Sequence, residues 1–391
     1  MLPDDVWPVS VNDHFVEPAG LWLDRLPRRR AADAPQVVEL DGGAQAWRFG
    51  PELVPLSVVL GAPLFRRDVK VPVTRIDHIA PAANETGARV ASMDRAKVAV
   101  HTLLPHICGF TGERLRQMGD PGLWADCIRA YNDFVLGEFC AAAPDRLVAL
   151  ALLPLADQTA TVAEIERVAA LGARGISLPH DPGNLGLDSY HRPSWARIFD
   201  AADAAGLPVF IHIASSGTSN AGSLAGWPSP DQPRYRPPEV QVAAANLHVL
   251  EAACDLAFSP LLTERPNRRV VLLEGNLSWM PYLEERLDFA THGRPAIAPK
   301  GRPAGQVMHD QILGAFISDP HGIRDRHLIG LDRFFWMGDY PHPDGFWPDD
   351  RSRLAAELSA VPNEEARQIA EGNARKLLKL AAWTPPVESG S

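Results

Sequence analysis

The sequence predicts an α/β fold, a (β/α)8 TIM barrel with long loop insertions after strands 1 and 5. Short apolar runs rich in β-branched residues alternate with helical patterns from about residue 98 onward, as in strand–helix repeats around a parallel sheet. The runs are apolar throughout, which is typical of strands buried on both faces. The length of 391 residues fits one barrel, since such barrels run from about 200 to over 400 residues.

Eight apolar runs are the candidate strands. In chain order they span residues 9–11, 98–105, 147–155, 174–179, 208–213, 270–274, 312–318 and 334–337. Between them, residues 160–171 and 194–205 have the periodicity of amphipathic helices, and each is followed by a glycine typical of a C-terminal cap, Gly172 or Gly206. No G-x-G-x-x-G or G-x-x-x-x-G-K-[ST] loop follows any run, so a nucleotide site is not indicated.

We expect a single barrel domain over residues 1–391. Two connections are long, residues 15–97 after the first strand and 214–269 after the fifth, and long loops of this kind commonly shape a substrate pocket or a dimer contact. The second of them contains a helical pattern near residues 238–262. Residues 381–391 are expected to form a flexible C-terminal tail.

Composition limits the classes of partner. The 38 basic residues against 48 acidic ones give a formal net charge of −10, without the basic block that nucleic-acid and anionic-membrane binding requires. No apolar run approaches the ~18 residues of a membrane span, and the start lacks a signal-peptide pattern, so we expect a cytoplasmic protein. Four scattered cysteines indicate neither disulfides nor a thiolate zinc site. We expect a small-molecule substrate and a homo-oligomer, a dimer.

Polar side chains with ligand chemistry follow several of these runs. His14 lies just after the first, His212 ends the fifth, Glu274 ends the sixth, and Asp339 and His342 follow the eighth. Catalytic groups of such barrels lie where the strands end, at the C-terminal face. Imidazole nitrogens and carboxylate oxygens meeting there are the ligands that Zn²⁺ or Mn²⁺ prefers. The sequence therefore predicts a divalent metal site at this face.

Several motifs carry a family resemblance that covers nearly the whole chain. They include Asp-His-Phe-Val-Glu-Pro with the following Leu-Trp and Arg-Leu-Pro, Ala-Ser-Met-Asp, Ala-Pro-Asp-Arg, the strand ending at His212, the segment 274–281, Gly-Asp-Tyr-Pro-His and a late Gly-Asn-Ala. In this order they make the chain resemble the amidohydrolase-related group of the metal-dependent amidohydrolase superfamily. That branch contains aminocarboxymuconate semialdehyde decarboxylase and the resorcylate and carboxyvanillate decarboxylases.

The resemblance implies that His14, His212 and Asp339 hold the metal, with Zn²⁺ expected first and Mn²⁺ as the alternative. The family has an acidic residue or a histidine two positions before the first-strand histidine, where this chain has Asn12. An amide oxygen is a weak ligand for Zn²⁺, so Asn12 completes the predicted ligand set at reduced affinity. The neighbouring Asp13 points to the opposite side of an extended strand unless a bulge rotates it.

Three residues are candidates for catalysis. Asp339 is a metal ligand, a general base on a metal-bound water, or both. Glu274 takes roughly the place of a histidine that handles protons in some relatives, and is expected to be an acid/base or substrate-orienting group, or else a buried ion-pair partner of a loop arginine. His342 is expected to donate a hydrogen bond or to contact substrate. His180 and His248 are weaker candidates.

Three functions stay open on the sequence. The first is a metal-dependent hydrolase acting on a C–N or C–O bond of a small organic substrate. The alternative is a non-oxidative decarboxylase of an aromatic or conjugated acid, which wants a cation for the substrate carboxylate, and the long loops offer four candidates, Arg48, Arg66, Arg75 and Arg234. The third is a metal-free barrel that uses Asp339, Glu274 and histidines for acid–base rearrangement or for binding.

Overall fold

Eight parallel strands form the central sheet of the protein. The computed structural model describes residues 2–56, 73–217, 240, 243–294 and 302–384. The strands follow the spatial order of the chain and are β1 (Val9–Phe15), β5 (Val100–Pro105), β6 (Leu147–Ala151), β7 (Gly175–Leu178), β8 (Val209–His212), β9 (Val270–Leu273), β10 (Ile312–Phe316) and β11 (Phe334–Trp336). Each predicted apolar run coincides with one of them, which confirms the expected strand count.

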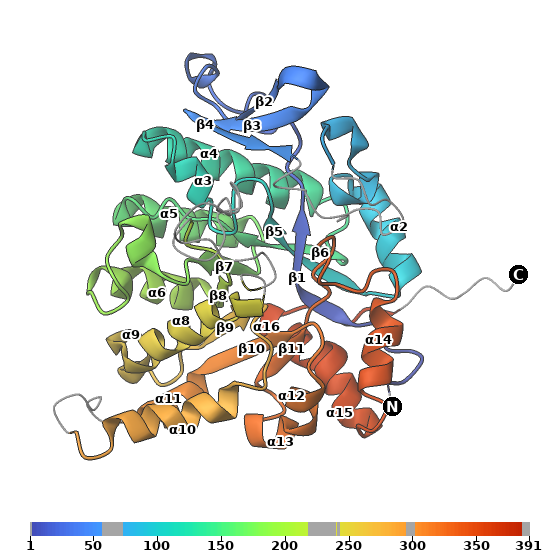
Figure 1. Ribbon diagram of the computed structural model, residues 1–391, viewed down its shortest axis with the longest axis vertical. Coiled ribbons are helices and arrows are strands. Elements are labelled where there is room, and N and C mark those ends of the chain that lie inside the picture. Colours follow the sequence, from blue (N-terminus) through green and yellow to red (C-terminus); the bar gives the residue numbers. More distant parts are fainter. Residues whose placement is uncertain (1, 57–72, 218–239, 241–242, 295–301, 385–391) are drawn as a thin grey trace, which may run out of the picture.

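The two edge strands approach each other and nearly close the sheet into a barrel (Figure 1). Beyond the end of β11, the Asp339 N–H donates to the carbonyl of Asn12 at 3.0 Å, and the His14 N–H donates to the carbonyl of Tyr340 at 2.6 Å. The chain after β11 thus continues the ladder along β1. This confirms the (β/α)8 class and brings the first and last strand ends together.

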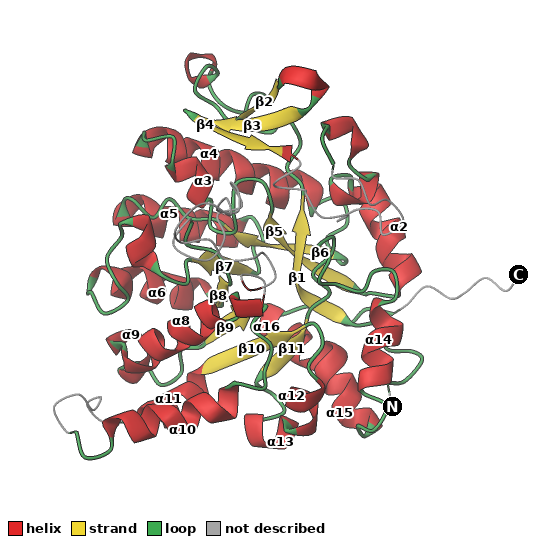
Figure 2. Cartoon of the chain, viewed as in Figure 1, coloured by secondary structure: helices red, strands yellow, loops and turns green. Residues whose placement is uncertain are grey.

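Helices surround this sheet (Figure 2). The main ones are α2 (Thr86–Ala96), α4 (Pro121–Phe134), α5 (Gln158–Ala170), α6 (Ser194–Ala205), α8 (Leu247–Phe258), α10 (Met280–Thr291), α11 (Ala304–Gln311), α14 (Asp350–Glu357) and α16 (Asn373–Leu378). Short ones are α3 (Glu113–Arg116), α9 (Pro260–Thr263), α12 (Pro320–Arg324), α13 (Arg326–Ile329) and α15 (Asn363–Arg367). Helices α5 and α6 lie where the sequence predicts them, and Gly172 and Gly206 after them have positive φ angles of 93° and 65°.

The insertion after β1 contains structure that the sequence did not predict. Its strands β2 (Gln36–Glu39), β3 (Gln45–Phe49) and β4 (Glu52–Pro55) form an antiparallel sheet outside the barrel (Figure 1). Trp47 of β3 is fully buried and packs edge-on against Trp22. Part of this insertion, residues 57–72, lies outside the described residues.

The insertion after β8 carries α8 and α9. The predicted helix near residues 238–262 is divided at Ser259, which adopts extended backbone and caps α9 by accepting a hydrogen bond from the Leu261 N–H. Residues 218–239 and 241–242 lie outside the described residues, as do 385–391 of the predicted tail.

Strand β1 contains a bulge that bears on the functional site. Ser10 pairs with His101 and Asp13 with Leu103, so β1 uses one more residue than β5 over this stretch. Val9 and Val11 pack in the barrel interior before the bulge. After it, Asn12 and His14 take that side and face the mouth of the barrel.

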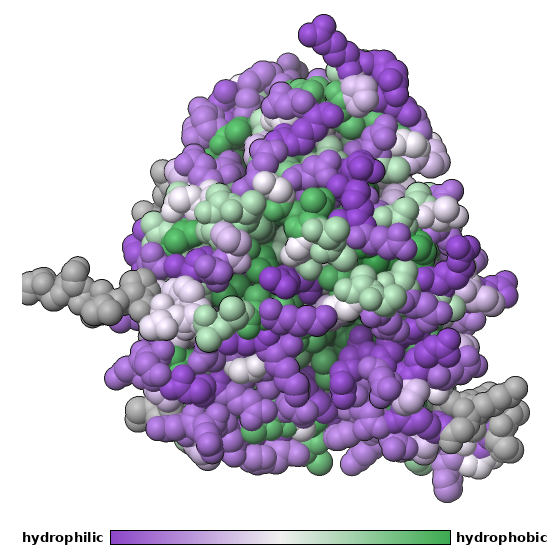
Figure 3. Space-filling view, turned by 180° about the vertical axis from the view of Figure 1, so that it is seen from behind, coloured by the Kyte–Doolittle hydropathy of each residue, from purple (hydrophilic) through white to green (hydrophobic). Residues whose placement is uncertain are grey.

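Side chains fill the barrel interior, while a second, larger core lies between strands and helices. A Cβ at Gly175 would lie 2.5 Å from the ring of Phe210, so β7 needs glycine there. Seen from behind, the surface is largely hydrophilic, with hydrophobic residues gathered in patches toward its centre (Figure 3). Within the described part of the chain, every helix falls short of the length and apolar character needed to cross a membrane.

Candidate metal centre

Four side chains from four strand ends meet at the mouth of the barrel. They are His14 of β1, His212 of β8, Glu274 just after β9, and Asp339 after β11, and each offers a ligand atom within 4.8 Å of the others. The side chains of His14, His212 and Asp339 are 0–1% exposed and that of Glu274 is 10% exposed. The structure therefore brings together four of the side chains that the sequence singled out. We call these four residues the carboxylate–imidazole group.

Backbone carbonyls fix the orientation of both imidazoles. Nδ1 of His14 lies 3.2 Å from the Pro105 carbonyl, and Nδ1 of His212 lies 2.7 Å from the Ile213 carbonyl. Because a carbonyl oxygen only accepts, each Nδ1 carries a proton. In the neutral imidazole, Nε2 then presents a lone pair, which is the arrangement typical of metal-binding histidines.

Both Nε2 atoms point at carboxylate oxygens. His14 Nε2 lies 3.3 Å from Oδ1 of Asp339, and His212 Nε2 lies 2.6 Å from Oε2 of Glu274. Among the described residues, His14 Nε2, Asp339 Oδ2 and Glu274 Oε2 have no hydrogen-bond partner. Three buried lone-pair atoms thus lie together without a hydrogen-bond donor of their own, and a divalent cation is the group that such atoms fit.

Burial makes this arrangement electrostatically unfavourable for the protein alone. Burial, reinforced by the Glu274 carboxylate, holds the pKa of Asp339 well above its usual range. Burial also raises the pKa of Glu274, but the adjacent His212 outweighs it, so the net shift is downward. Burial and the neighbouring His342 and His212 keep the pKa of His14 well below its usual range, so His14 is neutral at physiological pH and its Nε2 lone pair is available.

Two of the strand ends hold backbone strain. Glu274 and Asp339 have φ angles of 63° and 58°, in the left-handed region that non-glycine residues avoid. Such positions cost about 1–3 kcal/mol each and cluster at functional sites. The loop of Asp339 is held by strand β1, because the Gly338 N–H donates to Ser10 Oγ at 2.8 Å and the Tyr340 N–H to Asp13 Oδ1 at 3.1 Å.

Asn12 faces the group with its amide nitrogen. Nδ2 lies 3.2 Å from His212 Nε2 and 3.4 Å from Asp339 Oδ1, and both atoms accept hydrogen bonds. Its Oδ1 has no partner among the described residues. Asp13 lies on the other side of the strand despite the bulge, 3.7 Å from Nε2 of His101, and burial raises its pKa well above the usual range.

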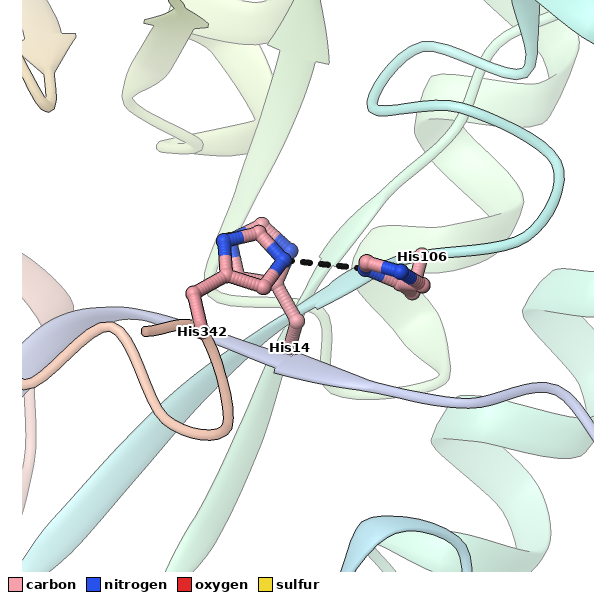
Figure 4. Close-up of side chains that lie close together, drawn as sticks. All are labelled: His14, His106 and His342. Carbon is pink, nitrogen blue, oxygen red and sulfur yellow. Dashed lines mark hydrogen bonds between the residues drawn. The ribbon is translucent and has the colours of Figure 1, made fainter. Parts of the chain in front are cut away.

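His342 links the group to a histidine that the sequence analysis missed (Figure 4). Its ring stacks on His14 with centroids 4.0 Å apart, Nδ1 lies 3.2 Å from Asp339 Oδ1, and Nε2 lies 2.9 Å from Nδ1 of His106. Burial lowers the pKa of His342. His106 directly follows β5, so the criterion that found the other strand-end residues applies to it as well.

The weaker candidates, His180 and His248, form a separate pair. Their rings stack with centroids 4.6 Å apart, and neither belongs to the carboxylate–imidazole group. Burial lowers the pKa of His180 to about 3. The His180 N–H donates to Ser215 Oγ at 2.9 Å, so this pair supports the loop after β8.

A cavity of about 420 Å³ opens beside the group. Two of the group, His212 and Glu274, line it together with the apolar Phe110, Ile213, Ala214, Ala245, Ile317 and Phe346 and the polar Asn246, Asn276, Ser318, His342 and Asp344. No lysine or arginine of the described residues is part of this lining. Arg75 is paired with Glu39 and Asp77 outside the barrel and Arg48 lies on β3, whereas Arg66 and Arg234 lie outside the described residues.

A larger cavity, of about 580 Å³, lies at the opposite end of the strands. Arg269, Lys376 and Leu377 are among its lining residues, and it contacts none of the carboxylate–imidazole group. The active sites of such barrels lie at the C-terminal mouth, so the smaller cavity is the candidate substrate site.

Comparison with known proteins shows what this chain is similar to. Gamma-resorcylate decarboxylase of Rhizobium sp. (strain MTP-10005) is 27% identical over 270 residues, which are 64% of this chain and 76% of that protein. Amidohydrolase map2389c of Mycobacterium avium subsp. paratuberculosis K-10 superposes with a TM-score of 0.75 at 22% identity, covering 99% of this chain and 100% of that one.

A second solved structure adds a metal to the comparison. The 5-carboxyvanillate decarboxylase of Novosphingobium aromaticivorans DSM 12444, complexed with manganese and 4-hydroxy-3-methoxy-5-nitrobenzoic acid, superposes with a TM-score of 0.65 at 16% identity and covers 96% of each chain. At these identities the two structures establish the fold. The sequence profile of the family described as Amidohydrolase matches residues 77–380, so the predicted resemblance is confirmed and the chain belongs to the amidohydrolase family.

Proposed function

We propose that this protein is a metal-dependent carboxy-lyase that removes CO₂ from an aromatic or conjugated acid without an oxidant. The observation that carries the proposal is the convergence of His14, His212 and Asp339, in which His14 Nε2 and Asp339 Oδ2 have no hydrogen-bond partner among the described residues. It favours a bound cation over the metal-free barrel. The decarboxylase activity of the 27% identical relative favours carboxy-lyase chemistry over the hydrolysis that the sequence put first.

His14, His212 and Asp339 would hold the metal. Two imidazoles and a carboxylate suit either Zn²⁺ or Mn²⁺, and a structural neighbour contains manganese. When bound, the cation supplies a positive charge that anchors and polarises substrate oxygens. This charge can serve the substrate carboxylate directly, which matters because the described lining of the cavity has no lysine or arginine.

The residues of the chain divide the remaining work. The apolar lining, including Phe110 and Phe346, packs against a flat ring and excludes water, while Asn246 and Asn276 offer hydrogen bonds to ring substituents. Asp339 Oδ2, which has no hydrogen-bond partner among the described residues, takes up a proton and delivers it to the ring carbon that bears the carboxyl group. As that C–H bond forms, the bond to the carboxyl carbon breaks and its electron pair stays on the ring carbon. CO₂ leaves and water reprotonates Asp339.

The test uses metal-loaded protein and a panel of hydroxybenzoic acids labelled with ¹³C in the carboxyl group. We expect ¹³CO₂ release and, in D₂O, one deuterium at the vacated ring carbon. Asp339→Asn should abolish CO₂ release, because it removes a metal ligand and the acid together, while asparagine tolerates the left-handed backbone at this position. Incorporation of ¹⁸O from labelled water without CO₂ release would contradict the proposal and restore hydrolysis.

A further inference from the structure

Both carboxylates of the carboxylate–imidazole group follow late strands, Glu274 after β9 and Asp339 after β11, and strand β1 contributes none. Strand β1 contributes Asn12, an uncharged amide that presents donors to Asp339 Oδ1 and His212 Nε2. A ligand must offer a lone pair, and the Oδ1 of Asn12 is the atom of this side chain that has one. In the structure the NH₂ group is turned to these two acceptors, and Asn12 holds their side chains in place.

Glu274 supplies a carboxylate on the opposite side of the same space. Its Oε2 lies 2.6 Å from Nε2 of His212, whose other nitrogen donates to the Ile213 carbonyl. Two lone-pair atoms at this distance repel each other unless a proton or a cation lies with them. Its ion-pair partner among the described residues is this histidine, not the loop arginine that the sequence offered as an alternative.

The backbone after β9 is shaped to aim Glu274. Glu274 itself is in the left-handed region, with φ of 63°. Gly275 follows, and a Cβ there would lie 2.4 Å from Cγ2 of Val249 on α8, so only glycine fits this turn. A strained acidic residue held by an obligatory glycine beside a metal-type imidazole indicates a functional carboxylate.

Resting on the proposed metal dependence, we infer that Glu274 is a fourth metal ligand, and that Asn12 is a positioning residue that donates to Asp339 when the His212 Nε2 lone pair is on the metal. The ligand set is then His14, His212, Glu274 and Asp339. Its two carboxylates balance the charge of a divalent cation in a buried site, and an imidazole that binds a metal does so in its neutral form. The carboxylate that strand β1 lacks is thereby supplied by the end of β9.

Metal affinity separates this inference from an acid/base role of Glu274. The chelator-treated full-length protein is titrated with Mn²⁺ by calorimetry, and Co²⁺-loaded protein gives an absorption spectrum that reports on the ligand set. We expect Glu274→Gln to weaken Mn²⁺ binding by more than the 10–100-fold typical of residues that only support ligands, and to change the Co²⁺ spectrum. Asp344→Asn removes another carboxylate beside the same cavity; it should leave the Co²⁺ spectrum unchanged and weaken Mn²⁺ binding far less than Glu274→Gln does.

Asn12 provides the complementary variants. Asn12→Ala should weaken Mn²⁺ binding about 10–100-fold without changing the Co²⁺ spectrum, since the ligand set stays the same. Adding Asn12→Asp to Glu274→Gln returns a carboxylate to the group and should recover most of the lost affinity. Circular dichroism establishes that each variant is folded before it is titrated.

Three results would overturn the inference. If Glu274→Gln binds Mn²⁺ as tightly as the wild type but loses turnover, Glu274 is an acid/base group, and the proposed carboxy-lyase function stands. If Asn12→Ala changes the Co²⁺ spectrum as Glu274→Gln does, Asn12 is itself a ligand. A wild-type protein that binds neither ion would remove the inference together with the proposed metal dependence.

Discussion

Binding of the metal should stabilise the fold, and His212→Ala should abolish that stabilisation. Unfolding entropy of ~2.1 cal/mol/K per residue gives ~0.8 kcal/mol/K for 391 residues. A ligand at ~1,000 times its Kd adds ~4 kcal/mol to the folded state, which corresponds to a rise of ~5 °C in Tm. The wild-type protein should show this rise when Mn²⁺ or Zn²⁺ is returned after chelation.

The variant should lose the rise for a structural reason. His212 is 1% exposed, and its Nε2 is one of the convergent lone pairs. His212→Ala also removes the hydrogen bond to Ile213 and the packing on Phe110, whose ring centroid lies 4.1 Å away, so its metal-free Tm should fall by a few degrees.

Differential scanning calorimetry with and without metal measures both effects. The matched control is His248→Ala, which removes a buried imidazole that accepts from the Ala214 N–H but does not belong to the carboxylate–imidazole group. This control should lose Tm and keep the metal-induced rise. An equal rise in His212→Ala and the wild type would refute the assignment of His212 to the metal centre.

Three further predictions concern buried groups. Asp13→Asn keeps an acceptor for the Tyr340 N–H and removes a carboxyl whose pKa burial raises well above its unfolded value. Because such a group favours the fold at low pH and loses that effect as pH rises, the Tm of the variant should exceed that of the wild type in alkaline buffer and equal it near pH 3. A constant difference in Tm across pH would argue against this reasoning. His180 has a pKa lowered to about 3, so it favours the fold above pH 6.5. This contribution to the free energy of unfolding is lost as pH falls toward 3, at up to ~1.4 kcal/mol per pH unit. The free energy of unfolding of His180→Gln in urea should therefore depend less steeply on pH, and an unchanged pH dependence would contradict the lowered pKa. Gly175→Ala places a Cβ 2.5 Å from the Phe210 ring and should destabilise the barrel by ~1–3 kcal/mol in urea unfolding. Adding Phe210→Leu should restore part of this stability. Full stability of the single variant would show that the ring can move aside.

The barrel strands were predictable because burial on both faces leaves an uninterrupted apolar run. The three-stranded sheet of the first insertion was not, because its strands are four or five residues long and β2 is only half-buried, so neither run length nor alternation stands out. The break between α8 and α9 depends on the extended backbone of Ser259, which the helical periodicity around it conceals.

The site was predictable in part, for a related reason. His14, His212, Glu274 and Asp339 directly follow or end apolar runs, and parallel strands bring such positions to one face. The link from His342 to His106 joins residues 236 positions apart, and no local pattern announces it. The orientation of the Asn12 amide depends on acceptors from β8 and the loop after β11, so residue identity alone leaves it open. The cytoplasmic location and the homodimer stay predictions.

Anomalous diffraction from crystals of the manganese-loaded protein, collected near the manganese absorption edge, tests the central claim most directly. We predict one peak per chain at the mouth of the barrel, within about 2.0–2.3 Å of His14 Nε2, His212 Nε2 and an oxygen of Asp339. A fully loaded crystal without a peak between these three side chains, or with manganese bound elsewhere, would contradict the metal centre on which the proposed carboxy-lyase function rests.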